Sequence, residues 1–366
     1  VNDDSTVEIH LPLNNGANLV SLYSLPENDS LGNIFNDINN NIEGVLGEGS
    51  SGYNMNGTWI GSLTELSTSA GYWFLMTAPD TLNLIGGPLN PNQIYNLHTG
   101  ANLISFPVPG NVGISEGLPD DMEGQISAII TAGAGAMNTD IGWIGSLINF
   151  EGGVGYWFLA DSSLSFSYNL EGLSRTALES YSEILPEGYH FHQSSEQAFY
   201  FVRDIILTRR NIEFGDWVLS YCGEEVTGIR QWHDNFMDIP VMGIDNSDLT
   251  DGYCREGDVP SFKLLRQDGE LINLIKEDGI PQWKSLGVYM IGDLMAEPPI
   301  PESYALRNAY PNPFNPVTNL RFELPANAQV EINVYDITGR LVETLIRSNY
   351  QAGYHLITWN ANQFAS

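Results

Sequence analysis

Acidic and hydroxyl side chains gather between Asp238 and Asp251, and oxygen atoms of this kind are the ligands that Ca²⁺ prefers. The candidate ligands are Asp245, Ser247, Asp248 and Asp251. The spacing is not that of an EF-hand, because Thr250 stands where that loop requires glycine. Two interpretations stay open: a looser calcium site, or a solvated loop whose aspartates accept hydrogen bonds from nearby backbone.

Two imidazoles, those of His190 and His192, fall on one face of an extended segment, and such a pair can bind Zn²⁺. A third ligand would have to come from His233 or Asp234. The separation of about 40 residues follows no recognisable zinc motif, so we do not expect a metal site here.

Aromatic rings recur in two clusters, where they could stack on sugars or fill the core of a small β-domain. The residues are Trp59, Tyr72, Trp73, Trp143, Tyr156 and Trp157. Neighbouring side chains of a strand point to opposite faces, so Tyr72 and Phe74 share one face and Trp73 lies on the other. At least one of these faces must be core, and carbohydrate contact is the alternative use of the rings.

Sequence motifs of hydrolases and nucleotide-binding enzymes do not occur in the chain. It contains no H-E-x-x-H, no G-x-S-x-G and no G-x-x-x-x-G-K-[ST]. Residues 47–52 match G-x-G-x-x-G formally, but Glu48 lies inside the segment and a strand is expected after it. We therefore expect a protein that is not an enzyme. A hydrolase would instead require a concave pocket with convergent carboxylates or imidazoles.

Cys222 and Cys254 are the only cysteines of the chain. In an oxidising extracellular setting a single pair is typical of a disulfide. Two buried free thiols are the alternative.

Charge is distributed unevenly along the chain. The formal net charge is −31, and no lysine or arginine precedes Arg175, whereas residues 1–174 hold 18 acidic residues. This balance excludes a general nucleic-acid role and a basic membrane-surface role, because phosphate and anionic lipid would be repelled. No apolar run approaches the length of about 18 residues that a membrane helix needs, so no membrane insertion is expected.

An internal repeat organises the first half of the sequence. Gly16-Ala17-Asn18-Leu19 recurs as Gly100-Ala101-Asn102-Leu103, Trp59-Ile60-Gly61-Ser62-Leu63 recurs as 143–147, and Gly71-Tyr72-Trp73-Phe74-Leu75 recurs as 155–159. All three offsets are 84 residues, and Asn54/Asn138 and Ile42/Ile126 keep the same offset. Because all these segments keep one offset, there was no net gain or loss of residues between them, which indicates a tandem duplication.

Each repeat is predicted to consist of strands joined by turns. In the first copy the strands are expected at 18–22, 42–46, 59–63 and 72–76. One helix is expected after Ser30, which would cap it, because Leu31, Ile34, Phe35 and Ile38 share one face at helical spacing. In the second copy Gly117 and Pro119 predict a shorter or distorted turn.

The C-terminal segment contains a long motif. It reads Tyr310-Pro311-Asn312-Pro313-Phe314-Asn315-Pro316, then a strand with alternating Val330, Ile332 and Val334, then Val334-Tyr335-Asp336-Ile337-Thr338-Gly339-Arg340 and a last strand at 354–359. This order closely resembles the C-terminal sorting domain of type IX (Por) secretion. The resemblance implies an Ig-like β-domain at about 304–366 and passage across the outer membrane of a Gram-negative bacterium. It implies nothing about the chemistry of the rest of the chain.

Both ends of the sequence give rise to expectations. Val1-Asn2-Asp3-Asp4 is typical of a mature or trimmed start rather than of a signal peptide. Members of the sorting family run on into a further strand, whereas this sequence stops at Phe364-Ala365-Ser366. We expect a truncated piece of a longer protein or a sorting domain without its last strand, which would leave a sheet edge unpaired.

The middle region is predicted to be β-rich as well, with strands at 197–202, 217–221 and 261–265. It resembles an uncharacterised β-domain that accompanies sorting signals, and the repeats resemble, more loosely, modules of secreted sorting-domain proteins. Neither resemblance implies an activity. Residues 297–303 are rich in proline and predict an extended linker.

These observations predict a mainly β protein of serial modules with few short helices. The expected domains are repeat 1 at 1–91, repeat 2 at 92–175, a middle domain at 176–296, the linker at 297–303 and the sorting domain at 304–366. The leading hypothesis is a secreted or cell-surface structural or adhesive protein that meets the type IX machinery and forms a homopolymer through strand edges. The alternative is a carbohydrate-binding protein that accompanies polysaccharide degradation. No cofactor is expected apart from Ca²⁺ in the acidic loop.

Overall fold

The computed structural model describes residues 6–175, 184–207, 211–233, 235–297, 301–314 and 316–362. The chain divides into two compact units, Val1–Ala296 and Glu297–Ser366. The division falls at the predicted linker, of which residues 298–300 lie outside the described part. The expected start at Val1-Asn2-Asp3-Asp4 and the last residues Phe364-Ala365-Ser366 lie outside it as well.

The two repeats have the same main sheet. Repeat 1 contains β1 (Val7–Leu13), β2 (Gly16–Ser21), β3 (Ser24–Leu25), α1 (Leu31–Ile34), β4 (Ile42–Gly47), β5 (Ser50–Met55), β6 (Thr58–Gly61), β7 (Gly71–Met76) and β8 (Asp80–Pro88). Repeat 2 contains β9 (Tyr95–Leu97), β10 (Gly100–Ser105), β11 (Asn111–Gly113), α2 (Ile114–Gly117), α3 (Asp120–Glu123), β12 (Ile126–Thr131), β13 (Ala134–Thr139), β14 (Gly142–Gly145), β15 (Asn149–Glu151), β16 (Gly155–Ala160) and β17 (Leu164–Phe166). Equivalent strands form five-stranded sheets of order β2-β7-β4-β5-β6 and β10-β16-β12-β13-β14. The mainly β fold predicted from the sequence is confirmed.

Equivalent polar side chains make equivalent hydrogen bonds in the two copies. Asn54 Nδ2 donates to the carbonyl oxygens of residues 39 and 42 at 2.7 and 2.9 Å. Asn138 Nδ2 donates to those of residues 123 and 126 at 2.6 and 3.2 Å. The hydroxyl of Tyr72 accepts from the amide of residue 67, and that of Tyr156 accepts from the amide of residue 151. Residues related by the 84-residue offset therefore have equivalent hydrogen-bonding environments as well as similar residue types.

The predicted helix of repeat 1 is a single turn. Ser30 occupies the N-cap position of α1, but its side chain donates to Asn28 Oδ1 and makes no capping bond. The expected apolar face is present, because Leu31, Ile34, Phe35 and Ile38 are all buried. In repeat 2 the interruption at Leu118-Pro119 separates α2 from α3, as the sequence predicts.

The two faces of each main sheet bury different partners. Tyr72 and Phe74 pack inside repeat 1, and Tyr156 and Phe158 pack inside repeat 2. Trp73 points to the opposite face, where it is 3% exposed in a cluster with Leu19 and Leu103. The alternation predicted for the Gly-Tyr-Trp-Phe segments is thus present, and both faces are core at this point.

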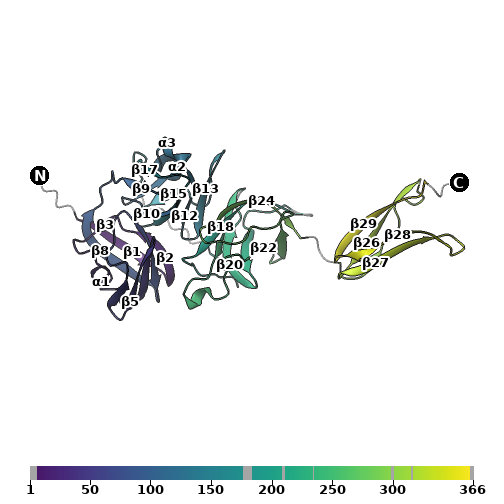
Figure 1. Cartoon of the computed structure of the whole chain (residues 1–366), viewed down its shortest axis with the longest axis horizontal. Helices are drawn as coiled ribbons and strands as arrows, with labels where there is room; N and C mark the ends of the chain where they lie inside the picture. Colours follow the sequence, from purple (N-terminus) through teal and green to yellow (C-terminus); the bar gives the residue numbers. More distant parts are fainter. Residues whose placement is uncertain are drawn as a thin grey trace. The chain divides into compact units, whose positions relative to one another are not determined.

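The repeats meet through a reciprocal, pseudo-two-fold interface, and Figure 1 draws their purple and blue strands side by side. The amide of Ser21 donates to the carbonyl of Gly153 at 2.9 Å, and the amide of Ser105 donates to that of Ser69 at 3.2 Å. Val20 bridges Val154 in the same way that Ile104 bridges Ala70. The two contacts of each pair are equivalent under the 84-residue offset: Ser21 corresponds to Ser105, and Gly153 corresponds to Ser69. Such reciprocity is the pattern of an isologous interface.

Glycine begins both Gly-Tyr-Trp segments because the other repeat passes directly over it. A Cβ on Gly71 would lie 2.8 Å from Leu103 Cδ1 and 3.0 Å from the carbonyl oxygen of Ile104. A Cβ on Gly155 would lie 2.7 Å from the carbonyl oxygen of Val20. These distances leave no room for a side chain without movement of the partner backbone.

The middle module forms one curled sheet. Its elements are β18 (Gln197–Ile206), β19 (Trp217–Cys222), β20 (Glu225–Gln231), β21 (Met237–Met242), η1 (Asp248–Thr250), β22 (Ser261–Leu265), β23 (Leu271–Ile275) and β24 (Val288–Ala296). The strand order is β20-β19-β22-β23-β24-β18-β21, with β18 and β24 parallel. Ser220 Oγ of β19 donates to the carbonyl of Pro240 in β21 at 2.7 Å, so the two ends of the sheet approach each other. Cys222 and Cys254 form a disulfide with Cα atoms 5.3 Å apart.

A buried carboxylate joins the middle module to repeat 2. The side chain of Asp238 is 0% exposed, and its Oδ1 accepts from the amide of Ser146 at 2.7 Å. Its Oδ2 accepts from the amide of Gly135, the hydroxyl of Ser146 and the guanidinium of Arg230, at 3.0, 2.8 and 3.0 Å. Arg230 also donates to the carbonyl of Gly133 at 2.6 Å. The sequence places Asp238 in an acidic loop, whereas it lies in β21 and acts between modules.

The contact between repeat 2 and the middle module also includes apolar packing and a hydrogen bond from an amide side chain. Phe199 and Phe201 are buried against Ile130 and the partly buried Met137 and Ile144 of repeat 2. Gln197 Nε2 donates to the carbonyl of Thr131 at 2.9 Å. The first three predicted modules are therefore packed into one unit rather than strung in series, because their outer sheet faces are apolar and cover one another.

The C-terminal unit is a small two-sheet domain. Its strands are β25 (Ala305–Leu306), β26 (Val317–Leu324), β27 (Ala328–Tyr335), β28 (Leu341–Tyr350) and β29 (Gly353–Asn360), in sheets β25-β26-β29 and β27-β28. Phe322, Leu324 and Ile332 are buried between the sheets. Asp336 Oδ1 accepts from the amides of Thr338 and Arg340, which forms the turn predicted at this point.

We predict that Gly155→Ala lowers the free energy of unfolding by about 1–3 kcal/mol, because its methyl group overpacks the repeat interface. Urea denaturation of the full chain measures this. Gly87→Ala is the matched control: nothing lies within 4 Å of a Cβ there, so a neutral or slightly stabilising effect is expected. Equal effects of the two substitutions would contradict the close approach of the repeats.

Candidate functional site

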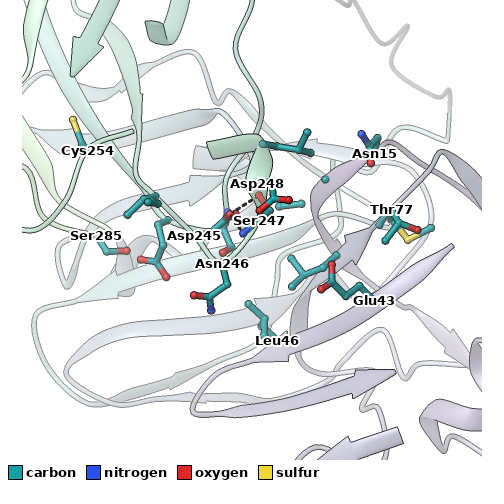
Figure 2. Close-up of a pocket in the computed structure, with 18 of the residues that line it drawn as sticks. Asn15, Glu43, Leu46, Thr77, Asp245, Asn246, Ser247, Asp248, Cys254 and Ser285 are labelled. Carbon is teal, nitrogen blue, oxygen red and sulfur yellow. Dashed lines mark hydrogen bonds between the residues drawn. The ribbon is translucent and has the colours of Figure 1, made fainter. Parts of the chain in front are cut away.

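A crevice of about 610 Å³ lies between the main sheet of repeat 1 and the acidic loop of the middle module. Figure 2 shows Asp245, Asn246 and Ser247 of the loop opposite Glu43 and Leu46 of the repeat. Its volume is within the range of ligand pockets. The apolar lining residues include Ala17, Leu46, Tyr53, Leu75, Leu249 and Trp283.

The crevice is acidic. Five carboxylates and one guanidinium line it: Glu43, Glu196, Asp245, Asp248, Glu256 and Arg255. Most of these groups are exposed, and Glu196 and Asp245 are half-buried. Such a lining attracts cations and repels anionic ligands such as phosphates.

The carboxylate of Asp245 organises the loop that forms this wall. Its Oδ1 accepts from the amide and hydroxyl of Ser247 at 2.9 and 2.7 Å and from the hydroxyl of Thr250 at 2.8 Å. Its Oδ2 accepts from Ser194 Oγ and the amide of Ser195, both at 3.2 Å. Burial alone would raise the pKa of Asp245, but the hydrogen bonds from Ser247, Thr250 and Ser195 outweigh it and lower that pKa.

The four predicted calcium ligands do not form a coordination site. Asp245 is engaged by donors on both oxygens, and Asp248 and Asp251 are exposed. No cluster of three or more histidine, cysteine, aspartate or glutamate side chains suited to a metal occurs among the described residues. The hydrogen bonds agree with a loop held by its own side chains, and the calcium site stays a prediction.

The two histidines lie close together, but among the described residues they belong to no group of three or more candidate metal ligands. The ring centroids of His190 and His192 are 6.1 Å apart, beside a smaller pocket that Glu225 and Asp251 also line. His233 contacts the ring of Phe214 instead, with centroids 5.2 Å apart. Asp234, the other predicted ligand, lies outside the described residues.

Three of the six aromatic residues considered as sugar platforms are buried, and Trp59, Trp143 and Trp157 are partly exposed. Tyr72, Trp73 and Tyr156 are buried and present no ring face to a ligand. Trp59 packs beside Phe35, with ring centroids 5.3 Å apart and ring planes inclined by 34°. Trp143 Nε1 donates to Glu123 Oε1 at 3.1 Å, and Trp157 lies between the clusters of the two repeats and the middle module.

A second concave surface lies on the outer face of β26 and β29 in the C-terminal unit. It measures about 890 Å³, and Tyr310, Tyr354 and Leu356 contribute exposed apolar side chains to it. Arg307 and Glu323 form a bidentate pair at its side, with nitrogen–oxygen distances of 2.6 and 2.9 Å.

Comparison with known proteins assigns this unit. Residues 308–366 match the family model of the secretion system C-terminal sorting domain. The tail is a type IX sorting domain. No curated protein and no solved structure matches the chain.

The sorting domain determines where the protein goes. It directs the chain to the extracellular space or the outer cell surface and implies contact with the type IX secretion machinery, as predicted from the motif at 310–340. Among the described residues, no helix is long and apolar enough to cross a membrane.

We predict that Asp245→Ala lowers the free energy of unfolding by about 1–3 kcal/mol at pH 7, because five donors lose a charged acceptor. A lowered folded-state pKa stabilises the fold above the ordinary value of 3.8, and this contribution disappears as the pH falls through the lowered pKa. The difference between wild type and variant should therefore shrink in acid.

Urea denaturation between pH 3 and pH 7 measures both effects. The exposed Asp251 of the same loop provides the control, and Asp251→Ala should change stability by less than about 0.5 kcal/mol. A pH-independent loss in the Asp245 variant would contradict the assigned role of the carboxylate.

Proposed function

We propose that this protein is a secreted, non-enzymatic surface protein with a structural or adhesive role, able to serve as a subunit of an extracellular assembly. The observation that carries the proposal is the exposure of apolar side chains on sheet faces in both units. Met55 and Ile60 in repeat 1 and Tyr354 and Leu356 in the sorting domain are all more than half exposed. Met55 and Ile60 are diagonal neighbours across β5 and β6, and Tyr354 and Leu356 share one face of β29. Exposed apolar side chains grouped in this way are typical of interaction sites.

The crevice supports contact rather than catalysis. Its best-ordered carboxylate, that of Asp245, accepts hydrogen bonds on both oxygens and has a lowered pKa, so it is poorly suited to take up a proton near neutral pH. The other carboxylates that line the crevice are less constrained, and Asp248 and Glu256 are exposed.

Strand pairing between subunits is one route to assembly. The edge strand β6 of repeat 1 pairs with β5 alone among the described strands, and most of its residues are exposed. An exposed edge strand is a template for strand addition. The carbohydrate-binding alternative would rest on Trp59, Trp143 and Trp157, which are partly exposed, because Tyr72, Trp73 and Tyr156 are buried in the core.

Electron microscopy and sedimentation of the purified chain test this function. Because the net charge is −31, we expect assemblies that grow as added salt screens the repulsion between subunits. Leu356→Glu should weaken them, whereas Val259→Glu, at a similarly exposed position of 56% against 58%, should not.

Monomers at every protein, salt and calcium concentration would contradict a subunit role. Specific binding on a glycan array by a fully folded chain would favour the carbohydrate-binding alternative instead.

A further inference from the structure

One sheet face of repeat 1 corresponds to the face of repeat 2 that holds the middle module. Leu46, Tyr53 and Ile60 stand 84 residues before Ile130, Met137 and Ile144. In repeat 2 the latter three pack against Phe199 and Phe201. We call the equivalent surface of repeat 1 the docking face; it consists of Leu46, Ser51, Tyr53, Met55, Ile60 and Ser62.

The docking face is exposed at Met55, Ile60 and Ser62 and borders the crevice at Leu46 and Tyr53, whereas its twin is covered by the middle module. Ile60 is 52% exposed whereas its equivalent Ile144 is partly buried, and Leu46 is partly buried whereas its equivalent Ile130 is fully buried. The middle module thus covers this sheet face in repeat 2, whereas the equivalent residues of β5 and β6 in repeat 1 have no such cover among the described residues.

The hydrogen-bond donors of the occupied site recur on the docking face. In repeat 2 the amide of Gly135 and the amide and hydroxyl of Ser146 hold the carboxylate of Asp238. Their equivalents in repeat 1 are Ser51 and Ser62. Ser62 is exposed, and its hydroxyl oxygen accepts from the amide of Ser51 at 3.3 Å.

The shape of the site is retained with one small change. A Cβ on Gly145 would lie 2.8 Å from Phe201 Cε1, and repeat 1 keeps glycine at the equivalent Gly61. Ser51 replaces Gly135, where a Cβ would lie 3.2 Å from Phe199 Cγ. A ring bound over Ser51 would therefore sit a few tenths of an ångström further from the sheet.

We propose that the docking face binds an antiparallel strand pair of a partner protein. This strand pair presents two aromatic side chains two residues apart and a carboxylate on the neighbouring strand. The occupant is inferred from the chain itself, in which Phe199, Phe201 and Asp238 have this arrangement and Asp238 lies opposite Phe201 in the strand pairing. The chain's own strand pair is buried against repeat 2, so the occupant of repeat 1 comes from another molecule.

The chemistry of the docking face agrees with this occupant. The six residues of the docking face carry no charge. At Ser51 and Ser62 a partner carboxylate meets an amide and hydroxyl donors, whereas Leu46 and Tyr53 border the acidic crevice. Aromatic rings bury large apolar areas and are enriched at the centres of protein interfaces. The proposal does not depend on self-assembly of the chain.

Calorimetric titration of the full chain with a cyclised hairpin tests the proposal. The hairpin carries residues 197–202 and 237–242 joined by two tight turns, with its core-facing side chains replaced by threonine. We expect one-to-one binding to the wild-type chain. Ile60→Glu and Ser62→Asp in the chain should each weaken it by about tenfold or more, as should Asp238→Asn in the hairpin.

Ile85→Glu is the matched control, because Ile85 is 59% exposed on β8, which belongs to a different sheet of repeat 1, and its substitution should leave binding unchanged. Absence of binding by a hairpin shown by circular dichroism to be folded would overturn the proposal. Binding that survives both Ile60→Glu and Ser62→Asp would also overturn it. Self-association of the chain that Ile60→Glu abolishes would assign the docking face to a second copy instead.

Discussion

The carboxylate of Asp238 is the contact on which the arrangement of the first unit depends. It is withdrawn from water, and four donors compensate for its loss of hydration: two amides and a hydroxyl of repeat 2 and the guanidinium of Arg230. A buried charge with all its partners fixes one geometry, because any displacement leaves the charge or a donor unsatisfied. The neighbouring rings of Phe199 and Phe201 supply the apolar area, and the carboxylate sets the register in which they dock.

Duplication explains both the symmetry and the asymmetry of this unit. The repeats pack reciprocally, and glycine at positions 71 and 155 allows the two backbones to approach. A pseudo-two-fold pair has two equivalent outer faces, but the chain contains one middle module. The middle module covers the outer face of repeat 2, whereas the equivalent face of repeat 1 is exposed around Ile60 and Ser62.

Much of the fold could be predicted from local pattern. The period of two in Gly71–Leu75 assigned Tyr72 and Trp73 to opposite faces, and the 84-residue offset located equivalent strands. β1 and β8 were not predicted, although alternating apolar residues such as Ile9 and Leu82 mark both. In β8 the signal is weakened because the exposed Ile85 is apolar, whereas β1 alternates regularly between apolar residues and the exposed Glu8, His10 and Pro12.

The candidate sites were harder to predict, because their chemistry depends on residues distant in sequence. The sequence gives no sign that Ser194 and Ser195, about 50 residues before Asp245, donate hydrogen bonds to its carboxylate. Asp238 precedes Pro240 and was grouped with loop residues, yet proline is compatible with an edge strand such as β21. Only tertiary contacts distinguish a carboxylate that holds modules together from one that binds a cation.

Amide hydrogen exchange at Ser146 and Ser62 tests the central claim most directly, since the two residues are equivalent in sequence and differ in whether Asp238 covers them. If the middle module is held on repeat 2 as described, the amide of Ser146 should exchange about as slowly as core amides of β12, and that of Ser62 much faster. Equally fast exchange at both residues, with the β12 amides still protected, would show that the middle module detaches freely and would contradict the account.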